Sequence, residues 1–164
     1  MSAQKCLLLA VVGILCLIKL GDASKEVLHK MSNHFKEALD DCKKELNLPE
    51  SIQRDFDMFW HDEYVVTNRE TGCAIMCLSH KLEIVDPDLS LQHGNAKDFA
   101  MKHGADETLA TELVAIINKC GEGAYDDDRC TMVLNWANCF KAEIHKKGMA
   151  PPVDVVIGEL VAEV

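Results

Sequence analysis

Two cysteines separated by three residues, Cys73 and Cys77, give the first indication of chemistry in this chain. In a helix, residues at i and i+4 lie on the same face with their Cβ atoms roughly 5–6 Å apart. A disulfide requires a Cβ separation of roughly 3.5–4.5 Å, so these two cysteines cannot bond to each other without breaking the helix. Each cysteine therefore needs a different partner, and a helix tied to two other segments would lie at the centre of a small fold.

The opposite side of the same expected helix is apolar except for one hydroxyl group. With a period of 3.6 residues, Ile75, Leu78, Ser79 and Leu82 form a stripe on the side away from the two cysteines. A helical serine usually donates to the carbonyl four residues earlier, here that of Ile75, or points to water. Its place in an apolar stripe argues against water. This side of the helix is therefore an apolar surface with a single polar group.

The first 23 residues have the pattern of a secretory signal peptide. A basic start precedes an apolar run over residues 6–18, and small residues lead to Ala23. The alternative is a membrane anchor, but a membrane span needs about 20 apolar residues and this run is shorter. We expect secretion after cleavage behind Ala23, which leaves a single domain of residues 24–164 with six of the eight cysteines.

Charge and cysteine content exclude several classes of function. The whole chain carries a net charge of −10, and residues 24–164 alone carry −11. Such a charge repels nucleic acid and acidic membrane surfaces. An even number of cysteines in an exported chain favours disulfides. Zinc is the alternative, but the sequence has no Cys-x-x-Cys or His-x-x-x-His pairs. We expect no metal and no cofactor.

Helical spacing of apolar residues continues through the domain, and no segment has a convincing strand pattern. A capping box of Thr67 and Glu70 would begin the helix that carries Cys73, and Asp106 is a suitable N-cap. The expected fold is all-α, a compact bundle of about six helices with a more apolar C-terminal tail, residues 148–164. The expected helices span residues 24–46, 51–60, 68–84, 95–102, 106–120 and 129–147.

The geometry of the cysteines restricts their pairing but does not decide it. Six cysteines allow 15 pairings. Cys130 and Cys139 would lie on opposite faces of one helix, roughly 13 Å apart along its axis. Excluding this pair, and Cys73 with Cys77, leaves 10 pairings, and spacing alone goes no further.

The cysteine gaps of 30, 3, 42, 9 and 8 residues resemble those of insect odorant-binding proteins. Segments around them resemble the moth pheromone-binding proteins more closely. The segments are Gly72-Cys-Ala-Ile75, His93-Gly-Asn-Ala-Lys-Asp-Phe-Ala100, Lys102-His-Gly-Ala-Asp-Glu107 and Cys139-Phe-Lys-Ala-Glu-Ile-His145. The resemblance covers the whole of residues 24–164. It implies three disulfides: Cys42–Cys77, Cys73–Cys130 and Cys120–Cys139.

The resemblance also implies a set of ligand-binding residues around an internal apolar cavity. Phe35 and Phe140 would hold the ligand chain between them, and Ser79 would donate to an alcohol, aldehyde or ester oxygen. Sequence pattern alone assigns most of these residues equally well to an ordinary core. The implied set is Ser32, Phe35, Phe59, Trp60, Ile75, Ser79, Ile117 and Phe140.

Acid-triggered release is a further implication of the resemblance. As a helix, the C-terminal tail has an apolar face suited to the same cavity, and its carboxylates Asp154, Glu159 and Glu163 oppose insertion until they are protonated. Relatives carry further histidines at the cavity mouth, where this chain keeps only His93 beside Gln92 and has Asn118. We therefore expect His93 to contribute less than histidines do in relatives.

The expected function is that of a secreted carrier of long-chain apolar molecules, and the resemblance implies that it works in the sensillum lymph. It would act as a monomer or weak dimer, with a small volatile ligand and a transient contact with an olfactory receptor or membrane as its partners. Lipid transfer without an olfactory role is the alternative. A lipolytic enzyme is improbable because His61-Asp62 has no adjacent cysteines and no glycine-rich calcium loop.

Overall fold

The computed structural model describes the backbone of residues 3–153 and the side chains of residues 22–153. The tail carboxylates Asp154, Glu159 and Glu163 lie outside the described residues. The described part is all-α, as predicted, with one isolated β-bridge between Val85 and Leu91. Its helices are α1 (Ala3–Glu45), α2 (Ile52–Asp57), α3 (Arg69–Lys81), α4 (His93–Lys102), α5 (Glu107–Gly123) and α6 (Arg129–Lys146).

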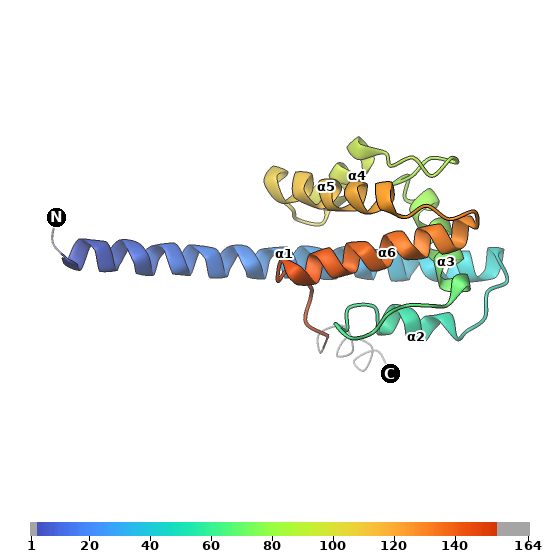
Figure 1. Cartoon of the computed structure of the whole chain (residues 1–164), viewed down its shortest axis with the longest axis horizontal. Helices are drawn as coiled ribbons and strands as arrows, with labels where there is room; N and C mark the ends of the chain where they lie inside the picture. Colours follow the sequence, from blue (N-terminus) through green and yellow to red (C-terminus); the bar gives the residue numbers. More distant parts are fainter. Residues whose placement is uncertain (1–2, 154–164) are drawn as a thin grey trace.

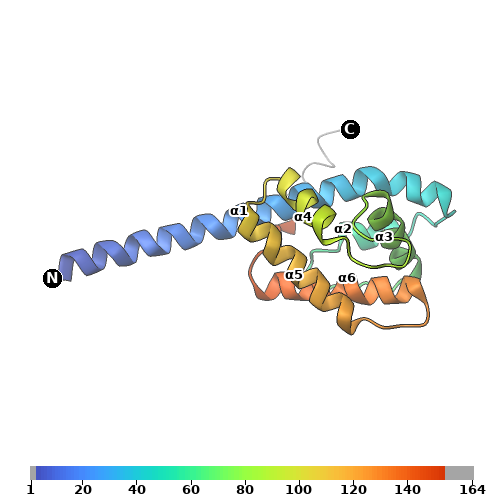
Figure 2. The same cartoon turned by 90° about the horizontal axis from the view of Figure 1, so that it is seen from above.

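The first helix is much longer than the sequence pattern predicted. The expected start was residue 24, but α1 begins at Ala3 and continues without a break to Glu45. Its N-terminal half extends beyond the other helices in both views (Figure 1 and Figure 2). The apolar run over residues 6–18 is rich in leucine, which favours helix, and no proline separates it from the next segment. Within the part of the chain that was described, no helix is long and apolar enough to cross a membrane.

The helix ends differ from the predicted ones by a few residues, and one predicted cap is wrong. The side chain of Asn68, not Thr67, caps α3 by accepting a hydrogen bond of 3.1 Å from the backbone N–H of Glu70. Asn68 adopts an extended backbone conformation that brings its short side chain to this amide. The N-cap at Asp106 is confirmed, since its carboxylate accepts from the Leu109 N–H at 2.8 Å.

Three disulfides connect the helices, and they are the pairs that the family resemblance implies. Cys42–Cys77 joins α1 to α3, and Cys73–Cys130 joins α3 to α6. Cys120–Cys139 joins α5 to α6. The α3 helix is therefore tied to two other helices from adjacent turns, as the spacing of its cysteines predicted. Each bridge is expected to stabilise the fold by roughly 2–4 kcal/mol.

Next to the Cys73–Cys130 bridge, α3 and α6 approach each other at backbone distance. A Cβ atom added to Gly72 would lie 2.1 Å from the backbone oxygen of Cys130. No side chain fits in that space, so glycine is required at this position for the two helices to meet.

An ion pair reinforces the same junction between α3 and α6. The Arg69 guanidinium donates to both carboxylate oxygens of Asp128, at 2.5 and 2.8 Å. Asp128 also accepts from the Thr131 hydroxyl at 2.8 Å and from the Cys130 N–H at 3.3 Å, which caps α6. The hydrogen bond from Arg69, followed by the one from Thr131, lowers the pKa of Asp128 to about 2. Asp128 therefore keeps its charge in mildly acidic solution.

We expect Asp128→Asn to lower the melting temperature by a few degrees, and by the same amount at pH 7 and pH 5. The pKa of Asp128 in the folded protein lies below its value of about 3.9 in the unfolded chain. The stabilisation by the Asp128 carboxylate is therefore complete above about pH 3.9 and is lost as the pH falls through about 2. Thermal unfolding of both proteins between pH 2 and pH 7 measures this. If the difference in melting temperature between the two proteins already changed between pH 7 and pH 5, the low pKa of Asp128 would be contradicted.

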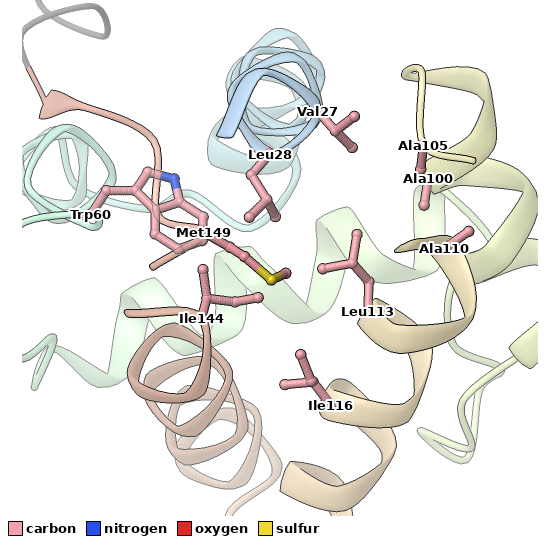
Figure 3. Close-up of a cluster of buried hydrophobic side chains, with 10 residues drawn as sticks. All are labelled: Val27, Leu28, Trp60, Ala100, Ala105, Ala110, Leu113, Ile116, Ile144 and Met149. Atoms are coloured by element: carbon pink, nitrogen blue, oxygen red, sulfur yellow. The ribbon is translucent and has the colours of Figure 1, made fainter. Parts of the chain in front are cut away.

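Buried side chains form three clusters that surround the centre of the bundle. The first joins α1, α4, α5 and α6 with Trp60 and Met149 (Figure 3). The second lies between the α3–α4 loop, α5 and α6, around Trp136. The third packs α1, α2 and α3 around Cys42. The clusters are separate, and the space that they enclose is not filled by side chains.

Candidate ligand-binding site

An apolar cavity of about 200 Å³ lies between the three clusters. For scale, an apolar cavity of roughly 150 Å³ holds a benzene molecule. Every helix contributes to its wall, together with the segment after α2 and the α3–α4 loop. All eight predicted ligand-binding residues are in this wall: Ser32, Phe35, Phe59, Trp60, Ile75, Ser79, Ile117 and Phe140. Their contact with a ligand stays a prediction.

Two of the predicted polar residues bind each other. The Ser32 hydroxyl donates to the Leu28 carbonyl at 2.8 Å and accepts from the Trp60 indole N–H at 2.9 Å. This contact fixes the Trp60 ring, which is buried, against α1. The donor of Ser32 and the donor of Trp60 are thus both used within the protein, and neither is available to a ligand without loss of an existing bond.

The hydroxyl of Ser79, in contrast, makes no hydrogen bond among the described residues. Its side chain lies in the wall of the cavity, and none of the hydrogen bonds found among the described residues uses its hydroxyl oxygen. The alternative predicted for it, a bond to the Ile75 carbonyl, is not formed. A hydroxyl without a partner, facing an apolar space, is suited to donate to or accept from one oxygen of a ligand.

Aromatic rings form much of the rest of the wall. The rings of Phe35 and Phe99 meet edge to face with centroids 5.5 Å apart, which joins α1 to α4. Phe59 and Trp60 make a second such pair at 5.0 Å. Phe140 packs against both the first and the second buried cluster, on the α6 side of the cavity. Phe35 and Phe140 therefore belong to different walls, as the prediction that they hold the ligand between them requires.

Buried polar groups hold the segment that presents Phe59 and Trp60. The Asp55 carboxylate accepts from the hydroxyls of Tyr64 and Thr71, and the bond to Asp55 raises the pKa of Tyr64. The Lys141 ammonium donates to the Tyr64 carbonyl, and burial lowers the pKa of Lys141. The segment between α2 and α3 is thereby attached to α2, α3 and α6.

Several wall residues were not predicted as ligand-binding residues. Phe99 and Lys36 are in the wall, as are Leu89 of the α3–α4 loop and Trp136. The buried face of α4 was readable from the spacing of Ala96, Phe99 and Ala100. The position of Lys36 in the cavity wall was not predictable from the sequence, because a charged residue on a helix usually indicates the solvent side.

The predicted pH-sensitive histidine lies on the surface of the bundle. His93 Nε2 is 3.0 Å from the Asn118 Oδ1, which links the start of α4 to α5. The Asn118 amide nitrogen donates to Glu122 at 2.9 Å, so the amide oxygen faces the histidine and accepts a hydrogen bond from its Nε2–H. A role of His93 in acid release stays a prediction.

The start of the C-terminal tail is attached to the cavity wall. Met149 and Pro151 are buried. The Met149 side chain lies among Leu28, Trp60 and Ile144 in Figure 3. Leu28 and Trp60 also line the cavity. The chain thus leaves the described part of the molecule beside the cavity.

Comparison with known proteins identifies the family of this fold and cavity. Residues 24–143 match the PBP/GOBP family. The chain belongs to the PBP/GOBP family. Pheromone-binding protein 2 of Epiphyas postvittana is 50% identical over 165 residues, which covers 100% of both chains. General odorant-binding protein 2 of Manduca sexta is 35% identical over 133 residues, 80% of this chain and 82% of its own.

A solved structure of the family has the same fold. The crystal structure of Epiphyas postvittana Pheromone Binding Protein 3 matches with a TM-score of 0.63 and 46% identity, over 67% of this chain and 95% of that one. The PBP/GOBP relatives are binding proteins and not enzymes. Membership of the family supports the binding of hydrophobic small molecules in the cavity.

Proposed function

We propose that this PBP/GOBP protein is a secreted carrier of long-chain pheromone or odorant molecules with a fatty alcohol, aldehyde or acetate head. Residues 1–23 would be removed on secretion, and the carrier would work in sensillum lymph. The observation that carries this proposal is the apolar cavity whose wall holds the unpartnered Ser79 hydroxyl. Burial of the apolar chain would supply most of the affinity, and Ser79 would fix the position of the head.

Competitive displacement tests the proposed function. The delipidated protein is loaded with a fluorescent hydrophobic probe, and a series of alcohols, aldehydes and acetates of increasing chain length displaces it. We expect affinity to rise with chain length until the cavity is filled and then to fall. A protein that bound none of these ligands, or that bound them without regard to chain length, would not be such a carrier.

We expect Ser79→Ala to weaken alcohols and acetates roughly two- to tenfold and to leave a hydrocarbon of the same length nearly unchanged. One neutral hydrogen bond contributes roughly 0.5–1.5 kcal/mol, and the hydrocarbon cannot form it. Displacement titrations of the three ligands measure the difference. Ser51→Ala is the control, because Ser51 is exposed and makes no side-chain cap bond. Equal losses for all three ligands would restrict Ser79 to a packing role.

We further propose that acid releases the ligand when the C-terminal tail enters the cavity. The attachment of Met149 beside Leu28 and Trp60 supports this, because it starts the tail next to the cavity wall. The carboxylates of the tail would be neutralised on entry, so acid favours insertion and neutral pH opposes it.

A further inference from the structure

Only two polar side chains in the described cavity wall have donors to spare for a ligand. The indole N–H groups of Trp60 and Trp136 donate to the Ser32 hydroxyl and to the Ile117 carbonyl. The Ser32 hydroxyl donates its one proton to the Leu28 carbonyl. This leaves the Ser79 hydroxyl and the ammonium group of Lys36, the one charged side chain among the wall residues.

Lys36 follows Phe35 in α1 and is mostly buried. Its side chain is 20% exposed, and its Nζ lies 3.3 Å from Oδ1 of Asp57 at the end of α2. An ammonium group has three donors, and this is the one acceptor found for it among the described residues. No acceptor for the other two donors is found among the described residues, while Lys36 is part of the cavity wall.

The partner of Lys36 does not depend on it alone. Asp57 is not part of the cavity wall, and its side chain is 33% exposed. The same Oδ1 atom accepts from the Gln53 side-chain amide at 3.2 Å. Asp57 therefore keeps a hydrogen bond if the ammonium group turns toward a ligand. The ion pair also explains how a lysine can lie in an apolar wall, since a buried charge requires a counter-charge.

An ammonium group in this position distinguishes ligand head groups differently from a hydroxyl. A hydroxyl binds any head oxygen about equally well, whereas an ammonium group binds a carboxylate through a charge-assisted bond roughly twice as strong as a neutral one. We propose that the cavity also binds long-chain carboxylic acids in their ionised form, with Lys36 as the residue that holds the carboxylate. This rests on the proposed carrier function and extends its ligands to fatty acids.

Lys36→Met tests the assignment, because methionine keeps the length and apolar character of the stem and removes the charge. Delipidated protein is titrated with hexadecanoic acid, hexadecanol and methyl hexadecanoate at a pH where the acid is ionised. We expect the acid to bind about tenfold more weakly and the alcohol and ester to change less than twofold. Lys30→Met is the matched control. Lys30 lies on the same helix outside the wall, is 52% exposed and pairs with Glu26.

Asp57→Asn provides a second test with the opposite sign. Removing the counter-charge frees the ammonium group for the ligand and removes a negative charge near its head, so affinity for the acid should rise several-fold while the alcohol is unchanged. A variant that merely disturbed the packing of α1 on α2 would weaken every ligand instead.

The outcomes separate this inference from the function on which it rests. Unchanged acid affinity in Lys36→Met, or equal losses for acid, alcohol and ester, would overturn the role of Lys36 while leaving the carrier function intact. An equal loss of acid affinity in Lys30→Met would show that only the overall charge of the protein matters, and would also overturn it. Failure of the unmodified protein to bind any of the three ligands would overturn the carrier function and this inference together.

Discussion

Replacing Phe140 with alanine is expected to weaken the binding of alcohol, acetate and hydrocarbon alike, by roughly ten- to a hundredfold. The ring lies in the cavity wall and packs against two buried clusters. Its removal takes apolar contact from every ligand regardless of head group, and full burial of a phenylalanine side chain contributes roughly 1.5–3 kcal/mol. Displacement titrations with the three ligands measure the loss, which should be uniform, in contrast to the selective loss expected for Ser79→Ala.

The same replacement also lowers stability, so the binding measurement needs a control for folding. Titrations are made well below the melting temperature of the variant, with its helix content checked by circular dichroism. Tyr125→Ala is the matched aromatic control, because Tyr125 is 84% exposed and lies outside the cavity wall. If Phe140→Ala stayed folded and retained full affinity, Phe140 would be a core residue without contact to the ligand. Phe35→Ala applies the same test to the opposite wall.

The helices were predictable because each has an apolar face of its own. The stripe of α5, with Leu113, Ile116 and Cys120, is buried as its period requires. Boundaries were less predictable because neighbouring residues compete for the same cap. Thr67 and Asn68 both had suitable side chains, and the backbone conformation of Asn68 decided between them. The predicted start of α1 was wrong because the expected cleavage site behind Ala23 does not interrupt the helical propensity of the chain.

The cavity itself could not be derived from the sequence. A residue such as Phe35 or Ile117 has the same place in the sequence pattern whether it packs against another side chain or lines a cavity. Only the family resemblance indicated the cavity. Contacts between distant segments were equally inaccessible. The bond between Trp60 and Ser32 spans 28 positions, and it links two of the expected ligand-binding residues to each other. Lys36 was overlooked because its counter-charge, Asp57, lies 21 positions away.

Removal of residues 153–164 is expected to leave ligand binding at pH 7 almost unchanged and to preserve it at pH 5, where we expect the intact protein to release its ligand. Entry of the tail into the apolar cavity requires Asp154, Glu159 and Glu163 to take up protons. From ordinary pKa values this costs roughly 11 kcal/mol at pH 7 and roughly 3.5 kcal/mol at pH 5. Because protons would be taken up on entry, insertion would become more favourable as the pH falls. The Asp128–Arg69 pair stays ionised in this range, so this junction between α3 and α6 does not share the response.

The charges of the tail provide a test with the opposite direction. Replacing the three carboxylates together, by Asp154→Asn, Glu159→Gln and Glu163→Gln, removes the cost of neutralisation at every pH. The tail of this variant should compete with ligand already at pH 7, so its affinity at neutral pH should fall toward the value that the intact protein shows at pH 5. Ligand titrations of the intact, truncated and neutralised proteins at both pH values measure this. If the truncated protein lost its ligand on acidification as steeply as the intact one, the trigger would lie in the helical shell and the tail would not be the plug.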